Sequence, residues 1–194
     1  MSPVVQDLRT TRIVAEVFRG AMRQLATGVS VLTTGRDENI AGMTITSLSS
    51  LSVDPPTLIV SIDRASPFWP RLERYRAFGV NILSASQLEI ADRFAAADST
   101  KDPDRFIGIE WASGVSGVPL LADALAAIDC EVEELIERHS HAIVIGRVLE
   151  VRVSRQRKGA LAYWQRQYVA IDQDEDAVKL AEVSLPTSRG LWSI

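Results

Sequence analysis

The sequence contains a single cysteine, Cys130, among its 194 residues. No disulfide can form within the chain, and a zinc site made of four thiolates is excluded. Basic residues are not in excess, because 21 Lys and Arg stand against 25 Asp and Glu, a formal net charge of −4. Nucleic-acid and anionic-membrane binders need a basic face, so both classes are disfavoured. Gly-x-Gly-x-x-Gly, Walker and Gly-x-Ser-x-Gly motifs are also absent, so any nucleotide is expected to bind without a Rossmann fingerprint.

Long hydrophobic runs are absent as well. No stretch approaches the roughly 18 uninterrupted apolar residues of a membrane-spanning helix. Residues 1–12 lack the apolar run of a secretory signal, so we expect a flexible leader there and a cytoplasmic protein without membrane contact. Hydrophobic residues make up 46% of the chain and charged residues 24%, as in globular proteins. We therefore expect one domain over residues 13–172 and a tail over 173–194.

Short β-branched and alternating segments predict a mainly β protein with peripheral helices. About six or seven strands are expected, including 29–34, 40–51 with a bend at Ser47, 57–62, 77–83, 128–133 and 141–153. In the 128–133 strand, Asp129 alternates with apolar residues and is expected on the solvent side. Tight turns between neighbouring strands favour an antiparallel barrel over an alternating βαβ sheet.

Three helices are predicted between and before these strands. The first has apolar residues three and four apart over 13–25, with Gly28 as a stop signal. The second begins at Ser66-Pro67, with Ser66 as N-cap. The third opens at Ser86 through a capping box and runs to Phe94 or Ala97.

The hydroxyl-rich block from Thr44 to Ser50 is the first candidate site. Alternation places Thr44 and Thr46 on one face of a strand, at its end. Several neutral donors placed together can hold a phosphate, Ser66 would add a second donor cluster, and Arg64 could supply charge. The pattern alone favours a plainer alternative, in which these residues are a solvated strand face and an ordinary helix cap.

His139 and His141 form a second candidate, because two histidines at i and i+2 are expected to share a strand face, where they could hold a metal ion. A metal site is disfavoured because no third ligand lies at a typical spacing. A histidine that binds or protonates a substrate is favoured over a metal ligand, and a plain turn histidine remains the alternative. Cys130 falls on the apolar side of its strand and is expected to be a core residue.

Taken in order, several segments of the chain resemble the flavin reductase family, the short-chain NAD(P)H:flavin oxidoreductases that serve two-component monooxygenases. The resemblance covers roughly residues 16–171. Its segments are Phe18-Arg-Gly-Ala-Met22, Ala26-Thr-Gly-Val29, Gly42-Met-Thr-Ile-Thr-Ser-Leu-Ser-Ser-Leu-Ser52, Asp54-Pro-Pro56, Phe78-Gly-Val-Asn-Ile-Leu83, Ala91-Asp-Arg-Phe-Ala95, Arg105-Phe106, Gly117-Val-Pro-Leu120 and Gly146-Arg-Val148, together with Cys130, His141 and Tyr168.

The resemblance implies a split β-barrel of the antiparallel Greek-key type that dimerises. It further implies FMN or FAD in a groove at the dimer interface, NADH or NADPH as co-substrate, and a separate oxygenase component. The implied flavin contacts are Thr44, Thr46, Ser47 and Ser49 along the flavin, Asp63 and Ser66 by the phosphate, Asn81 near the flavin chain, Phe94 and Ala95 packing beside it, and Tyr168 near the ring. His141 matches the family's histidine on the nicotinamide side and is the catalytic candidate.

The chain departs from the family pattern at two points. Ser140 stands where the family often has an aspartate before the histidine, and Pro67-Phe-Trp-Pro70 is bulkier than the family's Ser/Thr-rich stretch. Two alternatives remain open, a flavin-binding protein without reductase activity, such as a sensor or storage protein, and a reductase for another acceptor. A pure interaction domain is a third. The residues do not decide between FMN and FAD or between NADH and NADPH.

Overall fold

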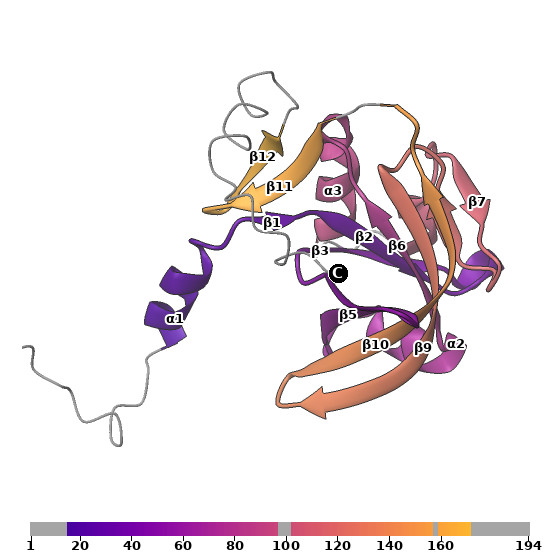
Figure 1. The fold of residues 1–194 in the computed structure, drawn as a ribbon, viewed down its shortest axis with the longest axis horizontal. Helices are drawn as coiled ribbons and strands as arrows, with labels where there is room; N and C mark the ends of the chain where they lie inside the picture. The colour runs from indigo at the N-terminus through magenta and orange to yellow at the C-terminus, as the bar shows by residue number, and fades with distance from the viewer. Residues whose placement is uncertain (1–14, 97–101, 157–158, 172–194) are drawn as a thin grey trace, which may run out of the picture.

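The fold is mainly β, as the sequence predicts, with helices at the periphery (Figure 1). The structure is a computed structural model that describes residues 15–96, 102–156 and 159–171. The predicted leader at 1–12 and tail at 173–194 lie outside these ranges. The strands are β1 (Thr27–Gly28), β2 (Ser30–Thr34), β3 (Ala41–Ile45), β4 (Ser49–Val53), β5 (Pro56–Asp63), β6 (Ala77–Ile82), β7 (Trp111–Ser113), β8 (Pro119–Leu121), β9 (Ala126–Arg138), β10 (His141–Val153), β11 (Ala160–Trp164) and β12 (Gln167–Ile171).

Seven of these strands form one antiparallel sheet in the order β3-β2-β6-β9-β10-β5-β4. Non-consecutive neighbours, such as β2 beside β6, give the sheet the crossovers of a Greek key. Two small sheets accompany it, β1-β11-β12 and β7-β8. The expected count of six or seven strands was too low. β1, β7 and β8 are two or three residues long and too short to show a period, the expected strand over 40–51 is divided into β3 and β4, and β11 and β12 were not predicted.

Two buried clusters form the core on either side of β2 and β6. Leu32 and Phe78 belong to one cluster, and Val31 and Phe94 belong to the other. Every residue of β2 is buried, because neighbouring residues point to opposite faces and both faces are covered. Gly42 of β3 lies so close to the Phe94 ring that a Cβ there would sit 2.5 Å from it, so only glycine lets α3 pack on this strand.

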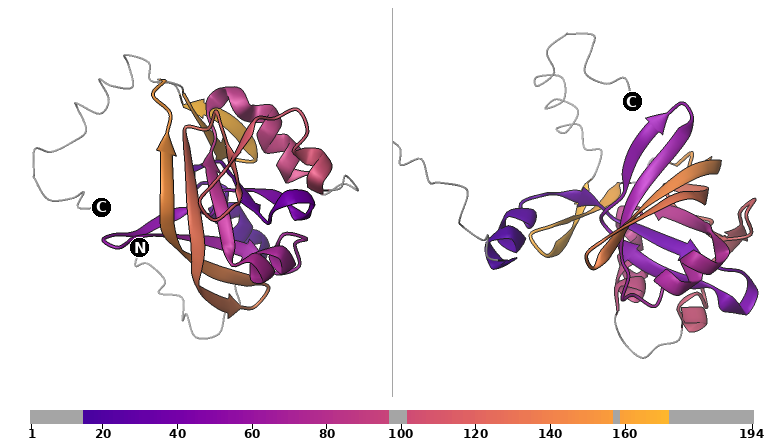
Figure 2. Two further views of the ribbon diagram at one scale, coloured as in Figure 1. Left: turned by 90° about the vertical axis from the view of Figure 1, so that its right-hand side faces the viewer. Right: turned by 90° about the horizontal axis from the view of Figure 1, so that it is seen from below.

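The helices are α1 (Ala15–Met22), α2 (Trp69–Tyr75), α3 (Leu88–Ala95) and α4 (Asp102–Arg105), with 3-10 turns at Asp37–Asn39 and Ala85–Gln87. Figures 1 and 2 show α1 and the β11–β12 hairpin projecting from one side of the main sheet. The first helix is shorter than predicted, because Thr27 pairs with Tyr163 and draws the chain into a strand before Gly28. No described helix is long and apolar enough to cross a membrane.

Three local predictions were wrong. Ser66 does not cap α2, which begins at Trp69, and Ser66 lies in the turn before it. The capping box uses Ser84 and not Ser86, since the Ser84 N–H donates to the Gln87 Oε1 atom at 2.9 Å. Asp129 is wholly buried, because its carboxylate accepts hydrogen bonds from the N–H and hydroxyl of Ser116 at 2.7 and 2.6 Å. Each error comes from a contact that local pattern does not reveal.

Candidate functional site

A cavity of about 700 Å³ lies between β3 and the helices α2, α3 and α4. We call it the α2–α4 cavity. It brings together four of the residues that the resemblance implied, Thr44, Ser66, Phe94 and Ala95. They come from β3, from the turn after β5 and from the end of α3. The fold therefore gathers part of the expected flavin site from three separate segments.

The hydroxyl of Ser66 is the feature of this cavity that best suits a polar ligand. Its Oγ atom is buried, and no hydrogen-bond partner for it exists among the described residues. A buried polar atom without a partner costs about 1–3 kcal/mol, so a ligand that supplies the partner is favoured. The Thr44 hydroxyl donates to the carbonyl of Ala91 at 2.7 Å, which leaves its oxygen free to accept.

Two arginines give the cavity positive charge, and sequence reasoning missed both. Arg71 of α2 donates to the Asp102 carboxylate at 2.8 Å and to the Pro67 carbonyl at 3.2 Å. Arg105 is buried and donates to the carbonyl of Ala96 at 2.7 Å. Arg71 and Arg105 both line the cavity, which suits an anionic ligand because arginine matches phosphate geometry. No spacing in the sequence links Arg71 with Arg105, since only the fold brings α2 and α4 together.

The rest of the hydroxyl block faces a second cavity. Thr46 and Ser47 line a groove of about 410 Å³ between α1 and the turn of the β11–β12 hairpin. We call it the α1 groove. The Ser47 hydroxyl is fixed, because it donates to the Ser61 carbonyl at 2.9 Å and accepts from the Ser61 N–H at 3.2 Å. Ser49 is exposed on the edge strand β4. The segment from Thr44 to Ser47 thus forms a wall of both cavities.

His141 and Asp63 stand directly opposite each other in the register of β10 and β5. Directly opposite residues project on the same face of a sheet, about 4.5–5.5 Å apart at Cβ. The Nδ1 atom of His141 lies 2.8 Å from the Ser140 hydroxyl, and the Asp63 carboxylate accepts from the N–H of Ala65 at 3.0 Å. Ser140 therefore orients the imidazole of His141, a role that the family pattern would assign to an aspartate at this position.

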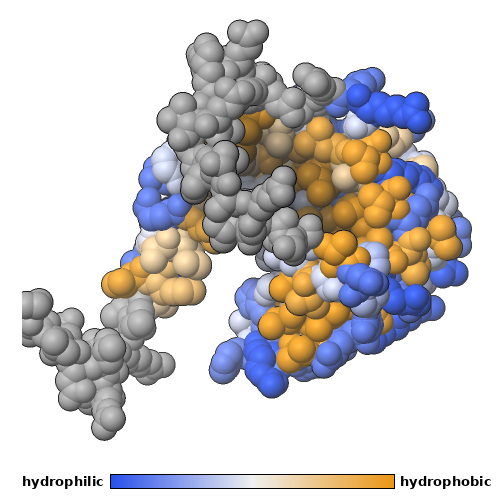
Figure 3. All heavy atoms as spheres, viewed as in Figure 1, coloured by the Kyte–Doolittle hydropathy of each residue, from blue (hydrophilic) through white to orange (hydrophobic). Residues whose placement is uncertain are grey.

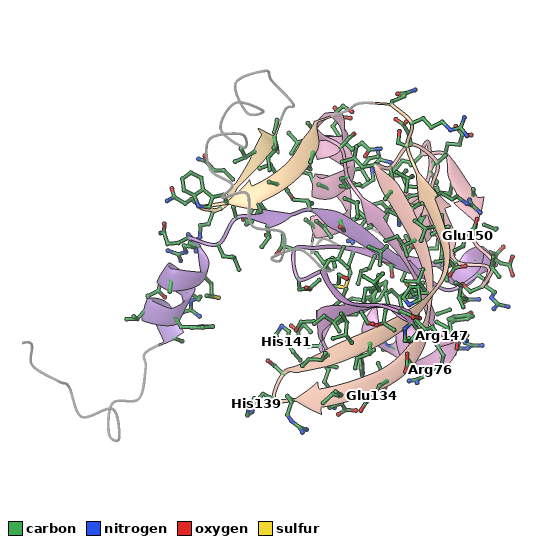
Figure 4. All side chains as sticks on the ribbon, in the orientation of Figure 1. Arg76, Glu134, His139, His141, Arg147 and Glu150 are labelled. Carbon is green, nitrogen blue, oxygen red and sulfur yellow. The ribbon has the colours of Figure 1, made fainter. Side chains whose placement is uncertain are left out.

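His139 does not share a strand face with His141. It occupies the turn of the β9–β10 hairpin with a φ of 54°, and Figure 4 shows it at the tip, beyond His141. Within the described ranges, no group of three His, Cys, Asp or Glu side chains is placed to hold a metal ion.

Arg64, which was expected to supply charge near Ser66, forms an ion pair with Glu137 of the same hairpin at 2.5 Å. It does not line the α2–α4 cavity.

Asn81 is wholly buried and lines neither cavity, and its expected place near the flavin chain stays a prediction. Its Nδ2 atom donates to the Val31 carbonyl at 3.0 Å, and its Oδ1 atom accepts from the Leu121 N–H at 2.7 Å. Both ends of the amide are used to join β6 to β2 and β8. The expected flavin contact came from the family resemblance, and no pattern in the sequence indicates these two hydrogen-bond partners.

Tyr168 lines neither cavity. Its ring packs edge-on against Tyr163, with centroids 5.3 Å apart. Burial, and then the nearby Asp92 carboxylate, raise the pKa of Tyr168. Its expected approach to the flavin ring stays a prediction.

A flavin fits the residues of the α2–α4 cavity, because its phosphate would give the buried Ser66 hydroxyl a partner and Arg71 and Arg105 an anion. Comparisons with known proteins point to the same ligand class. Residues 22–172 match the family model described as a flavin reductase like domain. The chain therefore belongs to this family.

Its relatives and structural neighbours carry flavin reductase names. It is 35% identical over 164 residues to a flavin reductase of Pseudomonas putida, covering 84% of this chain and 94% of that protein. It is 33% identical to the monooxygenase reductase subunit HsaB of Rhodococcus jostii, covering 81% and 78%. BorF, the flavin reductase component of a bacterial two-component tryptophan halogenase, superposes with a TM-score of 0.76 at 31% identity, covering 83% of this chain and all of BorF. The split-barrel fold implied by the resemblance is confirmed.

Proposed function

We propose that this protein is an NAD(P)H-dependent flavin reductase that passes a hydride from the nicotinamide to FMN or FAD and supplies reduced flavin to a separate monooxygenase. The observation that carries the proposal is the α2–α4 cavity, in which the unpartnered Ser66 hydroxyl lies with Arg71 and Arg105. Related proteins support it: the name of RutF from Cronobacter sakazakii, 31% identical, is FMN reductase (NADH).

When bound, the flavin supplies the hydride acceptor, and the protein supplies orientation and charge. The Ser66 hydroxyl would donate to the flavin phosphate, and Arg71 and Arg105 would neutralise its charge. Thr46 and Ser47 present hydroxyls at the bend that leads from this cavity to the α1 groove. The Thr46 hydroxyl is a neutral donor that would hold the polar edge of the ring without adding charge to it. The Ser47 hydroxyl gives its proton to the Ser61 carbonyl and would act only as an acceptor.

His141 positions the nicotinamide. Hydride transfer requires donor and acceptor atoms about 3–3.5 Å apart, so holding two rings in contact is the main task of the protein. The Ser140 hydroxyl, 2.8 Å from Nδ1, fixes the imidazole and leaves Nε2 for the ligand. No proton has to be removed from the substrate for hydride to move, so His141 contributes by placement and not as an essential base.

We further propose a homodimer in which a second copy covers the edge strand β4. Leu51 and Val53 of this strand are 51% and 60% exposed, and β4 ends the sheet order, so one side of its backbone is unpaired. Figure 3 shows wide hydrophobic areas on the face of Figure 1. Light scattering should give twice the chain mass, Leu51→Lys should give a monomer, and Val115→Lys, in an exposed loop, should remain a dimer. A monomeric wild type would contradict this.

We place the protein in the cytoplasm, where a free thiol such as Cys130 stays reduced.

The test of the activity is oxidation of NADH and of NADPH by the purified protein with FMN, with FAD and without flavin. Flavin-dependent oxidation supports the proposal and identifies the preferred pair. A protein that binds flavin but oxidises neither nucleotide is a flavin-binding protein without reductase activity. A protein that does neither shares only the fold.

A further inference from the structure

The α1 groove has the composition of a nucleotide-binding surface and has no part in the flavin phosphate site. Three arginines line it, Arg19, Arg23 and Arg166. Tyr163, Trp164 and the bend at 46–47 line it as well, together with the apolar residues Phe18, Met22 and Leu25. Guanidinium groups bind phosphate, and aromatic faces accept flat bases. A volume of about 410 Å³ holds part of a dinucleotide and not a whole one.

The three arginines are not equivalent. Arg19 and Arg23 share the carboxylate of Glu16, at 2.8 and 3.5 Å. For Arg166, the described part of the chain provides no ion pair. Its charge is therefore available to a ligand, whereas those of the other two are partly neutralised within α1.

The backbone at Arg166 is held in an unfavourable conformation. Gln165 and Arg166 are the two central residues of the β11–β12 turn, with φ of 48° and 66°. A two-residue turn with positive φ at both positions favours Asn-Gly, and side-chain-bearing residues there cost stability. Strain of this kind is kept where the side chain itself is needed. Both residues line the groove, and Arg166 is the one with a cationic side chain.

The turn is also fixed against α1. The Trp164 indole N–H donates to the Gln24 carbonyl at 3.3 Å, and the Gln165 N–H donates to the Arg23 carbonyl at 3.2 Å. These two bonds hold the turn, and with it Arg166, beside the end of α1. Arg166 is thereby fixed at the wall of the α1 groove.

The α1 groove adjoins the proposed flavin site through one short segment. Thr44 lines the α2–α4 cavity, and Thr46 and Ser47 line the groove. A ligand in the α1 groove would therefore lie next to a flavin that extends from the α2–α4 cavity along the segment 44–47. We propose that the α1 groove binds a phosphate of the nicotinamide dinucleotide and that Arg166 is the residue that contacts it. This inference rests on the proposed reductase function and adds to it the location of the second nucleotide.

The experiment compares Arg166→Gln and Arg166→Lys with the wild type, and Arg155→Gln serves as control because Arg155 is exposed and lines no cavity described above. Loss of one charge-assisted hydrogen bond should raise the KM of the nicotinamide nucleotide about tenfold, while kcat and flavin affinity stay within twofold. Arg166→Lys keeps the charge and should retain most of the affinity. Calorimetric titrations with NAD⁺ and NADP⁺ measure the same loss without turnover.

A loss confined to NADP⁺ and NADPH places the 2′-phosphate at Arg166, and an equal loss for both nucleotides places the pyrophosphate there. Arg166→Gly gives a second test, because glycine relieves the positive φ: Tm should rise while nucleotide affinity falls. Unchanged affinity for both nucleotides in Arg166→Gln, or an equal loss in Arg155→Gln, would overturn the inference. A wild type that binds nucleotide but reduces no flavin would refute the reductase proposal and leave the groove standing.

Discussion

The guanidinium group of Arg71 lies 2.8 Å from the carboxylate of Asp102, and this ion pair joins α2 to α4 along the wall of the α2–α4 cavity. Asp102 is the more buried partner, since its side chain is 13% exposed against 34% for Arg71. The carboxylate keeps the guanidinium in the cavity and at the same time offsets part of its charge. An anionic ligand therefore competes with Asp102 for Arg71.

Opposite effects are expected when the two partners of this pair are neutralised. Arg71→Gln should weaken FMN binding about tenfold, because a charge-assisted bond to phosphate is lost. Asp102→Asn should leave the affinity unchanged or increase it, since Arg71 is then released to the phosphate. Quenching of FMN fluorescence during titration measures both values. Equal weakening in the two variants would show that the pair supports the cavity wall and does not read the phosphate.

Ser66→Ala should change stability and flavin affinity in opposite directions. The Ser66 Oγ atom is buried without a partner among the described residues, so its removal from the flavin-free protein should leave Tm unchanged or raise it. Flavin binding should weaken by about 1 kcal/mol, or roughly fivefold, because the ligand loses a hydrogen bond. Differential scanning calorimetry with and without FMN gives both numbers. A destabilised flavin-free variant would mean that the hydroxyl has an internal role.

The sequence predicted the strands that carry a visible period, and it predicted part of the site. The hydroxyls of Thr44 and Ser66 were found because small donors cluster at strand ends and turns. Arg71 and Arg105 were missed, since they come to line one cavity only when α2 packs on β2 and β6 and α4 packs on β3. The bend was expected at Ser47, and the structure places Thr46 and Ser47 in a different cavity from Thr44. A local pattern gives the residue types, and long-range packing decides which of them meet.

Asn81 tests the distinction between a buried structural amide and a binding residue. Asn81→Ala leaves the Val31 carbonyl and the Leu121 N–H without their partners inside the core. Two unsatisfied buried groups should lower the free energy of unfolding by about 3 kcal/mol. Urea unfolding measures the loss, and Asn39→Ala, at an exposed position, is the control. The flavin affinity of the folded fraction should match the wild type, and a selective loss of flavin binding would return Asn81 to the site.

His141→Ala should lower kcat by less than about 10³-fold, because placement and not proton transfer is at stake. Ser140→Ala should have a smaller effect in the same direction, since it removes the 2.8 Å contact that orients the ring. His139→Ala provides the control at the exposed tip of the same hairpin. Steady-state kinetics with saturating flavin separates these effects. Complete loss of activity in a folded, flavin-binding His141→Ala protein would show that the histidine is essential to the chemistry.

The buried thiol of Cys130 should make the free energy of unfolding depend on pH in the alkaline range. Burial, and then the negative charge of Asp129, raise the pKa of the Cys130 thiol from 9.0 to about 12. The unfolded thiol releases its proton above pH 9 while the folded thiol keeps it, so ionisation favours the unfolded chain. The stability that this group contributes is complete below pH 9 and should decline by about 1.4 kcal/mol per pH unit as pH rises toward 12.

Cys130→Ala should be less stable than the wild type at pH 7, because it leaves a small cavity beside Phe78. The variant should also lose less stability than the wild type between pH 9 and 11. Urea unfolding across this range measures both slopes, and parallel slopes would show that the thiol does not titrate differently in the folded chain.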